Sequence, residues 1–166
     1  TIKENMPVFP GTEPPKLAPA STFETDGFRE TLLTMFSHTG THMDAPAHVR
    51  EDGITLDKFP ADKFVGKAIV IDCSDLSEGD IIDISYIDKY KVMIEYADFV
   101  LFKTNWDKYW DTPKYFDKFP VISEEVAYSL YCVAYNYSSY SYCNTLYSWG
   151  KTSGIIGFCD GTYKRS

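Results

Sequence analysis

The chain has 166 residues, the size of one ordinary domain, and we predict a single domain over residues 1–166. Hydrophobic residues make up 44% of it and aromatic residues 16%, and no apolar run is long enough to span a bilayer, so no membrane partner is expected. The formal net charge of −8 disfavours a nucleic-acid partner, because binding a polyphosphate requires clustered Lys and Arg. A small-molecule ligand, uncharged or zwitterionic, fits this composition better.

The first half of the chain predicts one loop, one strand and one short helix. Five prolines within residues 1–19 predict a surface loop, because proline removes ladder donors and fixes turn geometry. Residues 29–36, rich in Thr, Leu, Met and Phe, predict a strand. Residues 57–64 are amphipathic but contain Pro60, so only a brief helix is expected there.

Two apolar segments in the second half predict buried strands. Residues 67–73 contain Ala68-Ile69-Val70-Ile71, typical of a strand covered on both faces, and residues 98–104 predict another. Ser85 is a candidate cap for a short helix through Lys91, and a second helix is expected to begin at Ser123. Strands alternating with short helices predict an α/β layered fold.

The composition changes after about residue 126. Between residues 127 and 166, Tyr and Ser dominate and only four residues are charged. Residues 135–142 show neither helical periodicity nor a buried-strand pattern, so the sequence assigns them no structure. We therefore expect an atypical ending to the domain over residues 127–166.

The cysteine spacing and the lack of a recognisable signal peptide lead to expectations about disulfide bonds and about cellular location. Cys73, Cys132, Cys143 and Cys159 have neither the CxxC spacing of a zinc ribbon nor the density of a disulfide scaffold, so we predict free thiols. Because no signal peptide precedes the first predicted element, a cytoplasmic location is the default expectation.

The chain's three histidines, His38, His42 and His48, all fall within eleven residues, and Asp44 lies among them. Imidazole nitrogen and carboxylate oxygen are ligands of Zn²⁺ and related divalent ions, and a catalytic site uses about three protein ligands while leaving room for water. On an extended chain His38, His42 and Asp44 share one face, because they are separated by even steps. These three are the candidate metal ligands.

His48 lies farther along the chain and is the candidate catalytic acid or base. Imidazole exchanges protons near neutral pH, and hydrolysis needs a group that moves protons from water to the leaving atom. Pro46 keeps Ala45 out of the helical region, which would fix the direction in which the chain leaves Asp44. Zn²⁺ is the expected metal, and Mn²⁺ is compatible with this ligand set.

Aromatic residues outside this segment suggest a substrate pocket. Phe9, Trp106 and Trp110 could stack against a flat aryl group. Core packing and loop anchoring explain the same residues equally well, because aromatic clusters beneath long loops are common.

The run His38-Thr39-Gly40-Thr41-His42-Met43-Asp44-Ala45-Pro46-Ala47-His48 resembles the signature of the kynurenine formamidase/cyclase family, His-x-Gly-Thr-His-x-Asp-x-Pro-x-His. The resemblance extends to residues 6–11, 65–68, 104–106 and 119–125, about three-quarters of the chain. It implies a swivelling β/β/α-type α/β domain with a mixed sheet, assembled as a homo-oligomer, either a dimer or a tetramer.

The same resemblance implies metal-dependent hydrolysis of an amide, with His38, His42 and Asp44 as metal ligands and His48 as the catalytic histidine. An aryl formamide such as N-formyl-kynurenine, an intermediate of tryptophan catabolism, is the first expectation. Lactam or ester hydrolysis, or a cyclase reaction on the same centre, is the alternative within the family. The family completes a second metal site with a later His and Glu, which this sequence lacks after His48 and Glu125. A catalytically impaired metal-binding domain is therefore a further alternative.

Overall fold

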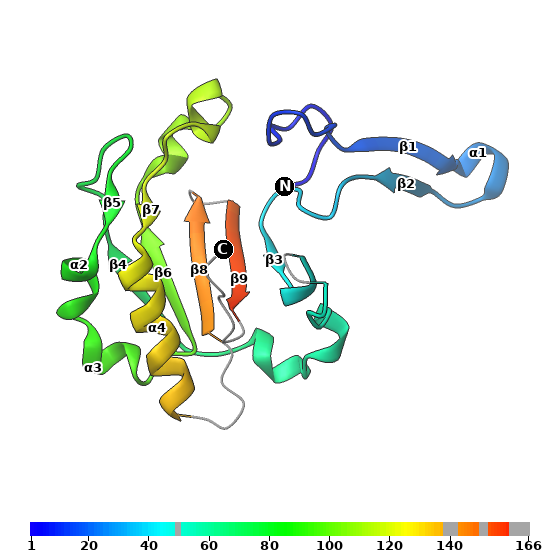
Figure 1. The fold of residues 1–166 in the computed structure, drawn as a ribbon. Coiled ribbons are helices and arrows are strands. Elements are labelled where there is room, and N and C mark those ends of the chain that lie inside the picture. Colours follow the sequence, from blue (N-terminus) through cyan, green and yellow to red (C-terminus); the bar gives the residue numbers. More distant parts are fainter. Residues whose placement is uncertain (49–50, 138–142, 150–152, 160–166) are drawn as a thin grey trace.

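A computed structural model of the chain describes residues 1–48, 51–137, 143–149 and 153–159 as a mixed α/β fold (Figure 1). The elements follow in the order β1 (Lys16–Ser21), α1 (Phe23–Asp26), β2 (Glu30–Thr34), β3 (His42–Asp44), β4 (Ala68–Asp72), β5 (Ile81–Ile82), α2 (Ile84–Asp88), α3 (Lys91–Ile94), β6 (Phe99–Lys103), β7 (Val121–Ile122), α4 (Glu124–Tyr137), β8 (Cys143–Trp149) and β9 (Ser153–Cys159). Short 3-10 helices occupy Pro46–His48, Leu56–Lys58, Ala61–Phe64, Trp106–Tyr109 and Pro113–Phe116.

The main sheet has five strands in the order β3-β9-β8-β6-β4. Strands β8 and β9 are antiparallel, whereas the pairs β3–β9, β6–β8 and β4–β6 are parallel, so the sheet is mixed. Strands β3 and β4 form its two edges. The predicted α/β class, with a mixed sheet and short flanking helices, is confirmed, whereas the single domain over residues 1–166 stays a prediction.

The core lies where helices α2, α3 and α4 gather beside β4 and β6 (Figure 1). The register pairs Ile69 with Val100 and Ile71 with Phe102, and all four side chains are buried. The prediction that both faces of the first apolar strand are covered was wrong, because Val70 is 52% exposed. Successive side chains of a strand point to opposite faces, so the helices cover only the face that carries Ile69 and Ile71.

The N-terminal part of the chain forms a hairpin arm, which we define as residues 16–34. Strands β1 and β2 pair antiparallel, and Figure 1 shows the arm projecting from the side of the molecule opposite the helices. The strand predicted at residues 29–36 is confirmed, but the loop predicted over residues 1–19 was wrong from Lys16 onward. Pro19 is tolerated in β1 because both strands of a two-stranded ribbon have an outer edge, and the register shifts between Pro19 and Ser21.

The helix predicted to begin at Ser123 is confirmed, whereas the helix predicted from Ser85 through Lys91 has a different cap and ends at Asp88. Asp83, rather than Ser85, caps α2, since its carboxylate accepts a hydrogen bond from the Ser85 backbone N–H at 2.9 Å. Helix α4 begins after Ser123, whose Oγ accepts from the Val126 N–H at 3.2 Å. The brief helix predicted at residues 57–64 is divided by Pro60 into two 3-10 helices. None of the helices in the described residues is long and apolar enough to cross a membrane.

The C-terminal part contains two strands, β8 and β9, where no strand was predicted. Of the tract 135–142, residues 135–137 belong to α4, and residues 138–142 lie outside the described residues. Strand β9 joins β3 to the rest of the sheet.

The free-thiol prediction can be checked at one cysteine. Cys73 is free and buried, and burial, helped by the charges of Asp75 and Asp72, raises the pKa of its thiol to about 12. The side chains of the other three cysteines lie outside the part that the structure describes.

Candidate active site

Three side chains from two neighbouring segments meet at one point. His38 lies in the turn that follows the hairpin arm, and His42 and Asp44 are the first and last residues of β3. His38 Nδ1 lies 2.6 Å from Asp44 Oδ1 and 3.1 Å from His42 Nε2, and the distance from His42 Nε2 to Asp44 Oδ1 is 3.5 Å. Among the described residues, this is the group of His, Cys, Asp or Glu side chains whose ligand atoms converge closely enough to hold an ion. The structure thus brings together the three residues predicted as metal ligands.

The convergence fits a divalent cation on chemical grounds. Within the described part of the chain, Asp44 Oδ1 is buried and has no hydrogen-bond partner of acceptable geometry, although two ring nitrogens lie near it. Tetrahedral zinc with bonds of about 2.0–2.1 Å would separate its ligand atoms by roughly 3.3 Å. The separations of 3.1 and 3.5 Å lie close to this value, and the separation of 2.6 Å between His38 Nδ1 and Asp44 Oδ1 is shorter. A buried carboxylate oxygen without a partner is costly, and a bound cation would remove that cost.

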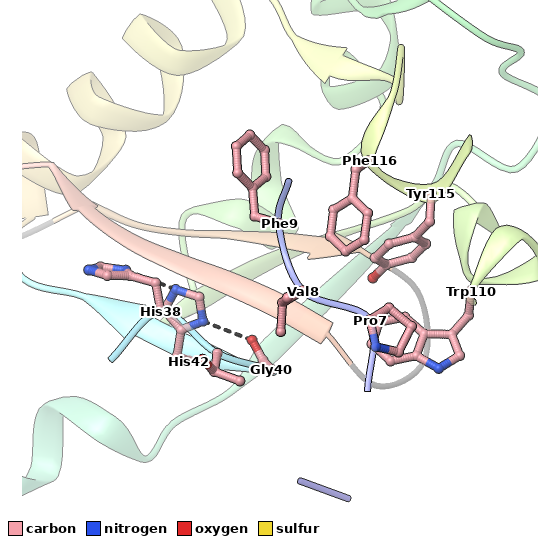
Figure 2. Close-up of a pocket in the computed structure, with 10 residues that line it drawn as sticks. Pro7, Val8, Phe9, His38, Gly40, His42, Trp110, Tyr115 and Phe116 are labelled. Atoms are coloured by element: carbon pink, nitrogen blue, oxygen red, sulfur yellow. Dashed lines mark hydrogen bonds between the residues drawn. The ribbon is translucent and has the colours of Figure 1, made fainter. Parts of the chain in front are cut away.

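The backbone fixes which nitrogen of His42 is available. His42 Nδ1 lies 2.8 Å from the Gly40 carbonyl oxygen, shown as a dashed line in Figure 2. A carbonyl can only accept, so Nδ1 carries the proton and Nε2 keeps its lone pair. Gly40 has a φ of 71°, the left-handed region that glycine enters without strain, and this turn carries its carbonyl to the ring. The Gly in the sequence pattern therefore sets the tautomer of His42, the second candidate ligand.

His48 stands beside the cluster without belonging to it. It ends the 3-10 turn Pro46–His48, and its ring centroid is 4.0 Å from that of His38. The Ala47 N–H donates to the Ile54 carbonyl at 3.2 Å. A Cβ on Gly53 would come within 2.4 Å of the Pro46 carbonyl carbon, so only glycine allows this close approach. The turn that carries His48 is thereby held against the next loop.

A pocket opens next to the cluster of candidate ligands formed by His38, His42 and Asp44, which we call the ligand cluster. Its lining combines three segments distant in sequence: Pro7, Val8 and Phe9; His38, Thr39, Gly40 and His42; and Trp110, Tyr115 and Phe116. Figure 2 shows the aromatic residues on the opposite side of this pocket from His38 and His42. Such a site, mostly apolar with a few polar groups at one end, suits a small aromatic molecule with a polar substituent.

The aromatic wall is built from edge-to-face contacts. Ring centroids lie 6.1 Å apart for Phe9 and Phe116, 5.0 Å for Tyr115 and Phe116, and 4.9 Å for Trp110 and Tyr115. Phe9 and Trp110, two of the three predicted substrate contacts, line the pocket. Tyr115 and Phe116 were missed, although they follow Pro113 in the same aromatic stretch of the sequence.

Trp106 has a different position. Its side chain is 2% exposed, it is not among the residues that line this pocket, and its Nε1–H donates to the Tyr115 carbonyl at 3.1 Å. Trp106 thus holds the backbone of Tyr115 from within the protein, the packing alternative that the sequence left open. Nearby, the Lys114 ammonium lies 2.7 Å from a Glu78 carboxylate oxygen, and this contact lowers the pKa of Glu78 and raises that of Lys114.

Comparisons with known proteins agree with this geometry. The model of the Cyclase family matches residues 1–132, so the chain belongs to that family. A kynurenine formamidase from Erythrobacter litoralis is 32% identical over 130 residues, which cover 76% of this chain and 56% of that protein. The chain therefore spans little more than half the length of this relative.

Solved structures give the same fold. Isatin hydrolase A from Labrenzia aggregata, bound to benzyl benzoate, has a TM-score of 0.62 and 25% identity, covering 75% of this chain and 58% of that one. A structure described as a "predicted metal-dependent hydrolase from Bacillus stearothermophilus" has a TM-score of 0.60 and 23% identity, covering 100% and 82%. At that identity the second likeness supports the fold alone.

Proposed function

We propose that this chain is a metal-dependent hydrolase that cleaves the amide bond of an aryl substrate, with an aryl formamide such as N-formyl-kynurenine as the first candidate. That substrate would give it a role in tryptophan catabolism. The observation that carries the proposal is the convergence of His38, His42 and Asp44 at the polar end of an aromatic-walled pocket. The resemblance to a kynurenine formamidase supports the substrate class.

The proposed roles follow from position. His38, His42 and Asp44 would hold the ion, Zn²⁺ first and Mn²⁺ as the alternative. When bound, such an ion lowers the pKa of a coordinated water and polarises a carbonyl group. Phe9 and Trp110 would orient the aryl ring, Trp106 would act only by supporting Tyr115, and the pocket wall would exclude bulk water. His48 would deliver a proton to the departing nitrogen, which is otherwise a poor leaving group.

A lactam of the isatin type is the second candidate substrate. The likeness to isatin hydrolase favours it, and the same ligand cluster and aromatic wall would accept a fused aryl lactam. Turnover of N-formyl-kynurenine and of isatin, measured side by side, would distinguish the two. A cyclase reaction would instead yield a ring-closed product detectable by mass spectrometry.

The decisive experiment combines metal analysis with kinetics. Purified protein should contain about one Zn²⁺ or Mn²⁺ per chain, and chelation should abolish hydrolysis. The variant His48→Ala should keep its metal and lose turnover, because His48 lies outside the ligand cluster. Metal binding without turnover of any formamide, ester or lactam would overturn the proposed activity and leave a metal-binding domain.

We also propose that the chain assembles as a homo-oligomer, a dimer or a tetramer. The hairpin arm supports this, because Leu32 and Leu33 are 60% and 48% exposed, and an isolated two-stranded ribbon has little stability of its own. Sedimentation analysis should show a mass above that of one chain. The variant Leu32→Ser should shift the mass downward, and a monomeric wild-type protein would contradict the proposal.

A further inference from the structure

Thr39 occupies an unusual position between the first two candidate ligands. It lines the pocket together with His38, Gly40 and His42, and it is only 4% exposed. It falls on a position that the family pattern leaves unspecified, so nothing in the sequence singled it out. The identity of its side chain therefore needs a local explanation.

The Thr39 hydroxyl is shielded from water and forms no hydrogen bond with the described residues. Within the described residues, Oγ1 is buried and makes no hydrogen bond. Valine would fill the same volume without losing hydration, so packing alone does not explain a threonine here. The other buried polar atom without a partner, Asp44 Oδ1, is explained by the candidate metal site, whereas Thr39 Oγ1 is not.

The polar groups around Thr39 are already committed. His42 Nδ1–H donates to the Gly40 carbonyl, and His42 Nε2 and His38 Nδ1 face Asp44 as candidate ligands. A hydroxyl can rotate to aim its proton. Thr39 directly follows His38 in the chain and precedes His42 by three residues. A carbonyl group presented from the pocket to His38 and His42 would enter a space that Thr39 also lines.

We propose that the Thr39 hydroxyl donates a hydrogen bond to the oxygen of the scissile carbonyl and stabilises the negative charge that develops there during hydrolysis. This inference rests on the proposed function, because it requires an amide or ester substrate in the pocket. A preorganised donor aimed at a developing oxyanion acts more strongly on the transition state than on the bound substrate. Thr39 would therefore contribute mainly to kcat and little to KM.

The test compares Thr39→Val, which removes only the hydroxyl, with Thr39→Ser, which keeps it. The control is Thr31→Val, the same substitution on the exposed strand β2 of the hairpin arm. For Thr39→Val we expect kcat to fall about a hundredfold with little change in KM. Thr39→Ser should recover most of the activity, and Thr31→Val should match the wild-type protein.

Metal content and thermal stability distinguish a substrate contact from a structural role. Thr39→Val should keep its full metal content and a thermal midpoint equal to or above that of the wild type, because a buried hydroxyl without a partner is removed. A lowered midpoint, with Val and Ser equally impaired, would overturn the assignment in favour of a structural role. Unchanged kcat in Thr39→Val would overturn it while the proposed hydrolase stands. A wild-type protein without turnover would overturn both.

Discussion

The two edge strands of the main sheet, β3 and β4, serve opposite purposes. Strand β4 alternates exposed and buried residues, and its buried side chains, Ile69 and Ile71, lie under the helices. Strand β3 is half-buried throughout and places His42 and Asp44 beside His38, where one carboxylate oxygen has no hydrogen-bond partner in the described structure. One edge contributes stability through apolar burial, whereas the other places polar atoms together at a cost. Stability and function should therefore respond to different mutations.

The largest contrast is expected from removing the final aspartate of each edge strand. Asp44→Ala deletes a candidate ligand and relieves a buried oxygen, so metal content and turnover should be lost while the fold persists. Asp72→Ala removes an exposed carboxylate at the end of β4 and should leave both unchanged. Elemental analysis and hydrolysis assays check the pair. Full metal content in Asp44→Ala would remove this residue from the ligand set.

The reciprocal contrast lies within β4. Ile71 is fully buried, so Ile71→Ala should lower the free energy of unfolding by about 2–5 kcal/mol. Val70→Ala, on the exposed face of the same strand, should cost less than about 1 kcal/mol. Urea unfolding measures both values, and metal content per folded chain should not change. Equal costs would mean that a second copy or another partner covers the Val70 face.

Gly66 and Gly53 extend the comparison between stability and function to the backbone, because neither position has room for a Cβ. A Cβ on Gly66 would lie 2.5–2.6 Å from the Asp98 side chain, whose carboxylate accepts from the Lys67 N–H, and a Cβ on Gly53 would meet the backbone at Pro46. Each substitution by Ala should cost about 1–3 kcal/mol in unfolding experiments. Only Gly53→Ala should also lower kcat, because it displaces the turn that carries His48. Equal kcat in the two variants would contradict this role for the turn.

The smallest effect concerns an ion pair between the segment that follows β4 and the wall of the pocket beside β3. Glu78 follows β4, and Lys114 belongs to the 3-10 helix that contributes Tyr115 and Phe116 to the pocket wall. The hydrogen bond and charge of Lys114 lower the pKa of Glu78 below its ordinary value of 4.5. The stabilisation is thus fully present above the unfolded-state pKa and is lost as the pH falls through the folded-state value.

Glu78→Gln tests this ion pair. It should lower the thermal midpoint slightly at pH 7 and by progressively less below about pH 4.5, because wild-type Glu78 becomes protonated there. A scan of midpoint against pH for both proteins gives the measurement. A difference that grows toward acid pH would contradict the assignment.

Several features of the fold and the site were predictable from local sequence. The apolar runs at residues 68–71 and 99–102 predicted β4 and β6, because β-branched and aromatic residues fit a pleated surface wherever it lies. The closeness of His42 and Asp44 was predictable, because residues two apart on a strand share one face, whereas His38 reaches them through the turn that Gly40 permits. The chain's small set of histidines, confined to this segment, left few other candidates.

The burial of each strand face and the contacts between distant segments could not be predicted from local sequence. The sequence of β4 does not show that one of its faces lies open. Pro14, Pro15 and Pro19 concealed strand β1, which begins only at Lys16 and tolerates Pro19 because the strand has an outer edge. The role of Tyr115 and Phe116 depends on Phe9, more than a hundred residues earlier in the chain. Strand β9, which joins β3 to the sheet, comes from the Tyr- and Ser-rich tail, where no strand was predicted.

The sequence by itself determined the identity and order of the candidate ligands, the family to which the chain belongs and the strands at the centre of the core, because each depends on residues that are close in the chain. Only the tertiary structure decided which aromatic residues form the pocket wall, that Trp106 binds the backbone of Tyr115 in this wall, and that the Thr39 hydroxyl is buried without a partner among the described residues. These properties arise from the packing of segments far apart in sequence, and no local pattern records which segments will meet.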